Sequence, residues 1–277
     1  MILDSIEKSI KEKIEKLGTP LSEWDIKINR GILTGFNEAF IISGIKREEL
    51  ISKDPKSAEI IRPILRGRDI KRYSYQYADL NLICTFPSRR YDIENYPAVK
   101  RHLLNFGYER LEQSGKLYVI NGEKITSRKK TNNKWFETQD SISYWEDFNK
   151  QNIVWSDIAK EPSFVWLPEN ILFNNTIYMI VGLEKKDLAV LNSSLIKWYF
   201  PTISSSLGGG NRYFKEFVQR IPLPKNTSVE NELELDRLVR SINKNGINSD
   251  LDNQIDDIVF SIFGLSNKEN NIIFNSC

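Results

Sequence analysis

Residues that could perform catalysis by themselves are almost absent from this chain. His102 is the only histidine, and Cys84 and Cys277 are the only cysteines. Three such residues cannot supply a zinc site made of paired histidine and cysteine ligands. A Ser-His-Asp or Cys-His mechanism would have to use His102, which lies in a segment typical of an amphipathic helix and is expected to be solvated or packed there. We therefore predict neither a catalytic site nor a metal site.

One pattern of carboxylates and lysine keeps a nuclease open as an alternative. Asp157 with Glu184 and Lys186 fits a D…E-x-K arrangement, the kind that holds a metal ion for phosphodiester hydrolysis. E-x-K also arises by chance in a chain this rich in Glu and Lys. No phosphate-binding G-x-x-x-x-G-K-[ST] loop is present. A stand-alone metal-dependent nuclease is therefore the less favoured interpretation.

The positive charge of the chain is concentrated in two short stretches. The net charge is only +2, but from Val229 onward nine acidic residues face four basic ones, so the excess positive charge lies before that point. Clustered cations neutralise phosphates and release counterions when a protein binds nucleic acid. Either stretch alone could equally be a solvated basic surface, but together, with aromatic residues close by, they favour nucleic acid. The two stretches contain Arg62, Arg66, Arg68, Lys71 and Arg72, and then Lys124, Arg128, Lys129, Lys130 and Lys134.

The elements that must position these residues are a mixture of strands and helices. Apolar residues at steps of three and four predict helices, and short apolar runs bounded by turn residues predict strands. The irregular order of the two predicts an α+β fold with a mixed sheet. Helices are expected at 1–17, 46–61, 97–113 and 186–199, strands at 24–32, 38–43, 80–86, 153–156, 164–166, 175–181 and 218–223, and an exposed loop or hairpin at 114–134.

Prolines and small polar residues between Pro222 and Ser228 mark a boundary, and beyond it the chain is helical. We expect a docking helix in residues 1–20, an α+β domain in residues 21–224 and a helical segment in residues 225–277. The acidic C-terminal helices are poor ligands for DNA, so we expect them to pack on the body or on a partner.

Several segments, in order along the chain, resemble a known family. Residues 28–42, which include Gly31-Ile32-Leu33-Thr34-Gly35-Phe36-Asn37, resemble the start of the TaqI-like C-terminal specificity domain. This domain is the target-recognition part of type IIG restriction-modification enzymes and related adenine methyltransferases. The resemblance covers about residues 20 to 275. Further similar segments are 64–73 (Ile-Leu-Arg-Gly-Arg-Asp-Ile-Lys-Arg-Tyr), 135–144 with 152–155, 191–199 with 221–224, and 254–269.

The resemblance implies a reader of double-stranded DNA in a restriction-modification system used for phage defence. The methyltransferase half of such enzymes carries an N-P-P-Y-type motif, and this chain contains no Pro-Pro pair. S-adenosylmethionine and Mg²⁺ are therefore expected only in catalytic domains or a catalytic subunit outside this chain, and no cofactor is expected within it. The chain would be a fragment or a separate subunit, and its partners would be DNA and that methyltransferase or nuclease.

Contacts to phosphates would set the position of DNA on such a domain. Candidates for these contacts are the cations of the first basic stretch, although Arg68 could instead form a structural ion pair with Asp69. The turn at 34–37 could present hydroxyl, backbone and amide donors, or could simply be turn chemistry. A segment similar to the S-R-Y-type turn of the family adds two arginines. The predicted phosphate contacts are Thr34, Gly35, Asn37, Arg66, Arg68, Lys71, Arg72, Arg89 and Arg90.

Contacts to base edges would specify the DNA sequence, and they should come from loops that project from the sheet. The stretch 114–134 is favoured because arginine, lysine and asparagine can pair with guanine and adenine edges. A second possible reader is Asn211 with Arg212, for which ordinary loop solvation is the alternative. The predicted residues of the first reader are Lys124, Arg128, Lys129, Lys130 and Lys134.

The chain has no pattern of a secreted or membrane protein. Its first residues interleave charges with apolar positions, unlike a signal peptide, and no apolar run is long enough to span a bilayer. With so few cysteines, a cytoplasmic location without membrane contact is expected. The remaining alternative is a protein-interaction or specificity subunit of a phage-defence methyltransferase complex, whose apolar helices bind a partner and whose cations are incidental.

Overall fold

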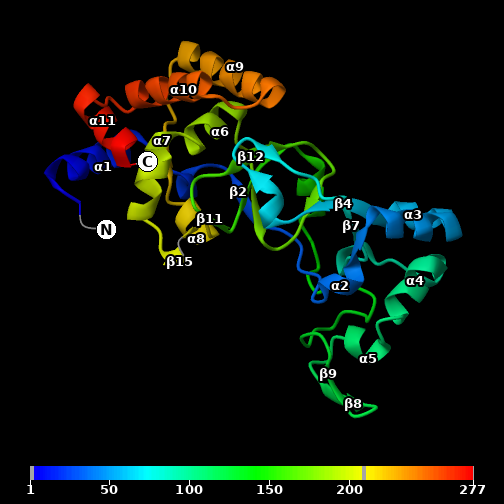
Figure 1. Ribbon diagram of the computed structural model, residues 1–277. Coiled ribbons are helices and arrows are strands. Elements are labelled where there is room, and N and C mark those ends of the chain that lie inside the picture. The colour runs from blue at the N-terminus through cyan, green and yellow to red at the C-terminus, as the bar shows by residue number, and fades with distance from the viewer. Residues whose placement is uncertain (1–2, 208–209, 277) are drawn as a thin grey trace.

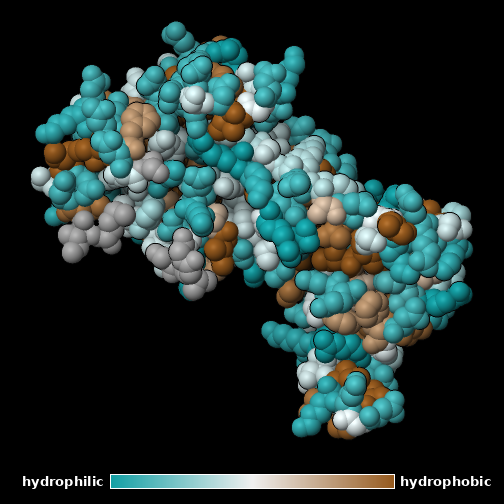
Figure 2. Space-filling view, viewed as in Figure 1, coloured by the Kyte–Doolittle hydropathy of each residue, from teal (hydrophilic) through white to brown (hydrophobic). Residues whose placement is uncertain are grey.

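The molecule is a bent chain of two lobes, described for residues 3–207 and 210–276 by a computed structural model (Figure 1). One lobe, at the left in Figure 1, carries both ends of the described chain, and the other extends to the lower right as an arm. Figure 2 shows that the surface is hollowed between the two lobes. Cys277 lies outside the described residues.

A four-stranded antiparallel sheet joins the lobes. Its strand order is β12-β10-β14-β2. Because successive side chains of a strand point to opposite faces, Ile153 and Trp155 of β10 enter the hydrophobic cluster of the first lobe, while Val154 enters that of the second. One sheet therefore contributes to both cores. The strands are β2 (Lys27–Arg30), β10 (Asn152–Ser156), β12 (Phe164–Leu167) and β14 (Ile177–Val181).

Helices cover the sheet in the first lobe. Helix α9 packs on α6 and α10, while α11 packs on α7 and α1. Leu235 and Leu238 of α9 lie in the same hydrophobic cluster as Trp155 of the sheet, so residues 225–277 share a core with the body. The predicted domain limits at residues 20 and 224 stay a prediction. The helices are α1 (Ser5–Leu17), α6 (Lys185–Leu191), α7 (Ser194–Tyr199), α9 (Val229–Asn245), α10 (Ser249–Ile262) and α11 (Asn267–Ser276).

The second lobe is built on a mixed sheet of order β13-β4-β7-β3, in which only β13 and β4 are parallel. Helices surround this sheet, and a β8-β9 hairpin forms the end of the arm (Figure 1). The strands are β3 (Ile41–Ser43), β4 (Ile61–Leu65), β7 (Leu80–Ile83), β8 (Leu117–Ile120), β9 (Glu123–Thr126) and β13 (Leu172–Phe173). The helices are α2 (Asn37–Phe40), α3 (Gly44–Lys53), α4 (Pro97–Leu104) and α5 (Tyr108–Leu111).

Short elements complete the chain, and the predicted α+β class with mixed sheets is confirmed. Strand β1 pairs with β17, β5 with β6, and β16 lies between β11 and β15. None of the helices within the described residues is long and apolar enough to cross a membrane. The short elements are β1 (Thr19–Pro20), β5 (Ile70–Lys71), β6 (Ser74–Tyr75), β11 (Ile158–Ala159), β15 (Ser206–Leu207), β16 (Gly210–Arg212), β17 (Pro222–Leu223) and α8 (Lys215–Val218).

Strands form within both predicted segments, 24–32 and 38–43, but the prediction that they flank one turn is wrong. The segment from Asn37 forms α2, and the strands on either side of it, β2 and β3, belong to different sheets. The predicted helix at 97–113 is broken by Gly107, whose φ of +87° a helix cannot accommodate. The predicted helix at 186–199 is two helices, because Ser193 caps the second one with its side chain. Of the two alternatives predicted for 114–134, a loop or a hairpin, the structure has the hairpin.

His102 has the packing role expected from the sequence. It is buried on α4, its Nε2 lies 3.0 Å from the carbonyl oxygen of Ala39, and its ring meets Phe106 edge-on. The imidazole therefore holds α4 against α2.

A buried carboxylate at the start of α6 makes the stability of the first lobe depend on pH. Asp187 accepts a hydrogen bond from the Glu184 backbone N–H, at 2.8 Å, and burial raises its pKa to about 6. The folded state therefore holds this proton more tightly than the unfolded chain, where the pKa is about 3.9. The protonated Asp187 carboxyl therefore stabilises the fold fully below pH 4, and this contribution is lost as the pH rises to 6.

We expect Asp187→Asn to remove this pH dependence while keeping the hydrogen bond to Glu184. Between pH 4 and pH 7 the free energy of unfolding of the wild type should fall by about 2 kcal/mol relative to the variant. Urea denaturation of both proteins across this range measures the difference. A difference that stays constant with pH would contradict the prediction.

Candidate nucleic-acid interface

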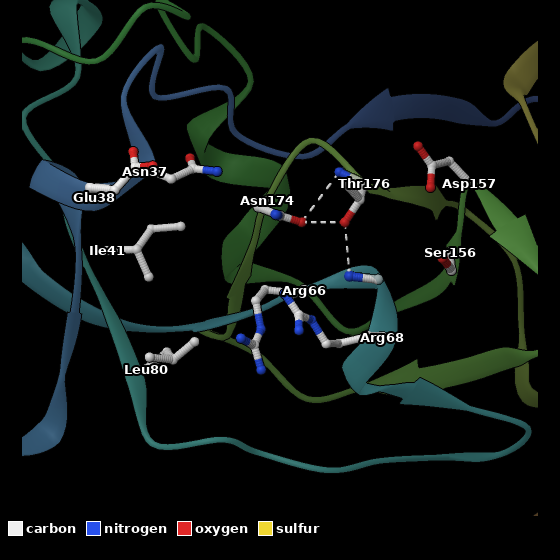
Figure 3. Close-up of a pocket in the computed structure, with 11 residues that line it drawn as sticks. Asn37, Glu38, Ile41, Arg66, Arg68, Leu80, Ser156, Asp157, Asn174 and Thr176 are labelled. Atoms are coloured by element: carbon white, nitrogen blue, oxygen red, sulfur yellow. Dashed lines mark hydrogen bonds between the residues drawn. The ribbon is translucent and has the colours of Figure 1, made fainter.

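A cavity of about 500 Å³ lies where the two lobes meet. Figure 3 shows polar side chains from both lobes around it, with Asn37 and Asn174 on one side and two arginines on the other. Segments far apart in the sequence line this cavity, so it exists only in the folded chain. Its lining residues are Asn37, Glu38, Ile41, Arg66, Gly67, Arg68, Leu80, Ser156, Asp157, Asn174 and Thr176.

The turn that follows β4 is held rigidly at the floor of the cavity. The Arg66 guanidinium donates to both carboxylate oxygens of Asp69, at 3.1 and 2.9 Å, and the Arg66 backbone N–H donates to the same group. Burial by itself would raise the pKa of Asp69, but the bonds and charge of Arg66 outweigh it and hold the pKa below its usual value. The expected structural ion pair thus involves Arg66 and not Arg68.

Gly67 brings this turn close to the central sheet. Its N–H donates to Thr176 Oγ1 at 2.8 Å, and a Cβ at this position would lie 2.6 Å from Ser156 Oγ and 3.1 Å from the Thr176 carbonyl oxygen. Only glycine allows this approach without a shift of its neighbours. The contact fixes the backbone position of the next residue, Arg68.

Arg68 is the cation that this arrangement leaves available. It is exposed, and within the described residues its side chain makes no hydrogen bond and no ion pair within 4 Å, although its charge acts on Asp69. Figure 3 shows its side chain extending into the cavity beside that of Arg66. An unpaired guanidinium at the mouth of a polar cavity can donate to a phosphate or to a guanine edge without first breaking an internal contact.

The predicted turn at 34–37 forms the opposite wall. Thr34 is fully buried, and its hydroxyl donates to Asn37 Oδ1 at 2.7 Å and accepts from the Phe36 N–H. The Thr34 side chain, a predicted phosphate contact, is therefore a structural part of the turn. Gly35, with φ of +78°, and Asn37 are exposed, and Asn37 lines the cavity.

Arg128, a predicted base contact, is buried inside the second lobe. It is only 4% exposed, and burial lowers its pKa to about 10. Its guanidinium donates at 2.7 to 2.9 Å to four backbone carbonyls that come from separate segments. These carbonyls belong to Leu111, Thr34, Glu137 and Trp135. Arg128 thus ties the 34–37 turn to α5 and to the segment before residue 140.

Arg72, a predicted phosphate contact, is likewise bonded within the fold. Its guanidinium donates to both carboxylate oxygens of Asp252 on α10, at 2.5 Å each, and to the carbonyl oxygen of Asn192. This pair joins the body to the C-terminal helices. Lys71, its neighbour on β5, is exposed.

The remaining predicted contacts are divided between the arm and smaller sites. Lys124, Lys129, Lys130 and Lys134 are exposed on or beside the hairpin of the arm. Arg89 and Arg90 are exposed in the turn after β7, with the guanidinium of Arg89 5.7 Å from the Trp145 ring centre. Asn211 and Arg212 are half-buried on β16 and pair with β11. The predicted cations therefore do not form one continuous patch.

Sequence reasoning missed the part of the cavity that comes from the central sheet. Ser156 ends β10, Asn174 follows β13 and Thr176 precedes β14, and their polar character at the ends of apolar runs is the signal that could have found them. Asp157 also lines the cavity. Burial raises its pKa, while Arg30, whose Nη2 is 3.9 Å from Asp157 Oδ2, opposes the rise.

The residues of the alternative nuclease pattern are not brought together. Asp157 lines the cavity between the lobes, whereas Glu184 and Lys186 line a separate pocket against α9, where Lys186 pairs with Glu232 at 2.8 Å. Within residues 3–207 and 210–276, no group of three His, Cys, Asp or Glu side chains is placed to hold a metal ion. The D…E-x-K pattern is thus a coincidence of sequence.

Comparison with known proteins defines the class of protein to which this fold and site belong. The family model of the TaqI-like C-terminal specificity domain matches residues 62–223, a stretch that includes Arg66, Arg68 and most of the cavity wall. The chain belongs to this family, the specificity domains of type II restriction-modification enzymes. No curated protein matches the chain.

Two solved structures share the fold. The type IIL restriction-modification enzyme MmeI, solved in complex with DNA, matches with a TM-score of 0.64 at 13% identity over 92% of this chain. The type IIG restriction endonuclease BpuSI matches with a TM-score of 0.53 at 12% identity over 94% of this chain. The matched region is 35% of the MmeI chain and 34% of the BpuSI chain, so this chain spans about a third of either enzyme.

Proposed function

We propose that this chain recognises a target sequence in double-stranded DNA for a restriction-modification system, with the duplex lying between the two lobes. The observation that carries the proposal is Arg68, an exposed arginine that lines the polar cavity at the bend and makes no hydrogen bond or close ion pair to any residue that the structure describes. Its segment lies within the stretch that matches the specificity-domain family. The surface is hollowed at this bend (Figure 2).

The two lobes would then contribute different contacts. Arg68, Asn37 and the exposed backbone at Gly35 would hold phosphates at the bend, which sets the position of the duplex. The exposed lysines of the arm would neutralise phosphates further along the same duplex. Arg66, Arg72 and Arg128 would support this surface from inside the protein.

We also propose that the chain carries out no chemistry itself and directs a separate catalytic part to its target site. The chain spans about a third of MmeI and BpuSI, which leaves room in such enzymes for further domains. S-adenosylmethionine and Mg²⁺ would act in that catalytic part, in the cytoplasm where the DNA lies. Whether methylation, cleavage or both follow depends on the partner.

Salt dependence of DNA binding tests the proposal. The full chain should bind a fluorescently labelled duplex in anisotropy titrations, and the affinity should fall at least about tenfold between about 50 and 200 mM salt, because each neutralised phosphate releases a counterion. A protein-interaction subunit with incidental cations would show no binding at the lowest salt, and that result would reject the proposal.

A further inference from the structure

The hairpin at the end of the arm presents one fully exposed face. In the β8-β9 register, Leu117 lies opposite Thr126 and Val119 lies opposite Lys124. Cross-strand partners of an antiparallel pair point to the same side, so these four side chains share one face, which we name the ribbon face. All four are exposed, with Leu117 at 59% and Val119 at 67%.

The opposite face of the hairpin anchors it to the arm. Tyr118 lies opposite Ile125, and both are half-buried. The Tyr118 hydroxyl donates to the Glu112 carboxylate next to α5. At the base of the hairpin, Arg110 donates to the Thr126 carbonyl oxygen at 2.9 Å. The ribbon face therefore keeps a fixed direction, away from the body of the arm.

The turn of the hairpin also favours a defined shape. Asn121 and Gly122 connect the strands with φ values of +51° and +84°. Two consecutive positive φ values at an Asn-Gly pair are those of a type I′ turn, whose twist matches that of paired strands. A two-stranded ribbon of this kind has the width that the major groove of B-DNA admits.

The charge around the ribbon face indicates which partner covers it. Two large aliphatic side chains on a projecting tip are unfavourable in water without a partner. Figure 2 shows hydrophobic surface at this tip beside hydrophilic surface. Lys116, Lys129 and Lys130 are exposed next to the hairpin, in addition to Lys124 on the face itself. A polyanion that also offers apolar groups fits this surface, and DNA offers the C5-methyl groups of thymine in its major groove.

We propose that the ribbon face enters the major groove and that Leu117 and Val119 determine specificity by contacting thymine methyl groups. Lys124 and Thr126 on the same face supply polar contacts to neighbouring phosphates. This inference rests on the proposed function and deepens it, because it assigns sequence reading to an apolar surface where the sequence analysis expected cationic side chains.

The test begins with a binding selection by the full chain from a randomised duplex pool, followed by replacement of each selected thymine with deoxyuridine. Deoxyuridine keeps the base pair and removes only the methyl group. We expect at least one replacement to weaken wild-type binding about fourfold, the effect of one buried methyl group. The same replacement should change the affinity of Leu117→Ala or Val119→Ala less than twofold.

Controls separate this inference from the proposed function. Ile45→Ala removes an equally exposed aliphatic side chain, 81% exposed on α3, and should retain the full response to deoxyuridine. Lys124→Ala should weaken binding to every duplex alike. Salt-sensitive binding with no response to deoxyuridine, or with an equal response in Leu117→Ala and Val119→Ala, would overturn the inference and leave the proposed function standing. Absence of any DNA binding would reject both.

Discussion

Arg68→Glu is expected to lower the affinity of the chain for duplex DNA by about tenfold or more at low salt. Within the described residues the wild-type guanidinium has no hydrogen bond or close ion pair to release, so the energy of a charge-assisted hydrogen bond, about 1.5 to 3 kcal/mol, is available to the DNA. A carboxylate in the same cavity repels phosphate. The plot of log affinity against log salt should also become shallower by about one unit. Anisotropy titrations at four salt concentrations measure both quantities.

The matched control for this variant is Lys268→Glu. Lys268 is exposed in the first turn of α11, which lies at the left end of the molecule in Figure 1, away from the bend, and the change in net charge is the same. An acidic residue is favourable near a helix N-terminus, so folding should not suffer. Equal losses in Arg68→Glu and Lys268→Glu would mean that only net charge matters and that the bend is not the binding surface.

Arg128→Met is expected to reduce stability while leaving the surface unchanged. The variant leaves the buried carbonyls of Leu111 and Trp135 without the donor that Arg128 supplies, whereas those of Thr34 and Glu137 keep a second donor. Each buried acceptor left unpaired costs about 1 to 3 kcal/mol, so the free energy of unfolding should fall by about 3 kcal/mol. At about 2 to 4 °C for each kcal/mol, Tm should fall by several degrees.

Lys129→Met provides the control because it makes the same kind of change one residue away. Lys129 is exposed, and a substitution on the surface usually changes stability by less than about 0.5 kcal/mol. Thermal denaturation followed by circular dichroism compares the three proteins. If Arg128→Met melted like the wild type but lost DNA binding, Arg128 would contact DNA, and the structural role assigned to it would be wrong.

The cations illustrate how far sequence can identify a site. Arg66, Arg68, Arg72 and Arg128 are chemically equivalent in the sequence, and all four were predicted DNA contacts. Three of them are engaged by partners inside the fold, namely Asp69, Asp252 and a set of backbone carbonyls. Asp252 is 180 residues from Arg72, so local patterns could not have revealed that pair. Among these four arginines, Arg68 alone makes no hydrogen bond or close ion pair within the part of the chain that the structure describes.

The sequence by itself determined the family, the α+β class and the hairpin of the arm, because these depend on motifs, on hydrophobic periodicity and on turn residues that act over short distances. It also limited the available chemistry through the scarcity of histidine and cysteine. Only the tertiary structure decided which cations are available and which residues share a wall of the cavity. Ion pairing and burial depend on segments brought together by packing of the two cores around one sheet, and no local pattern encodes that arrangement.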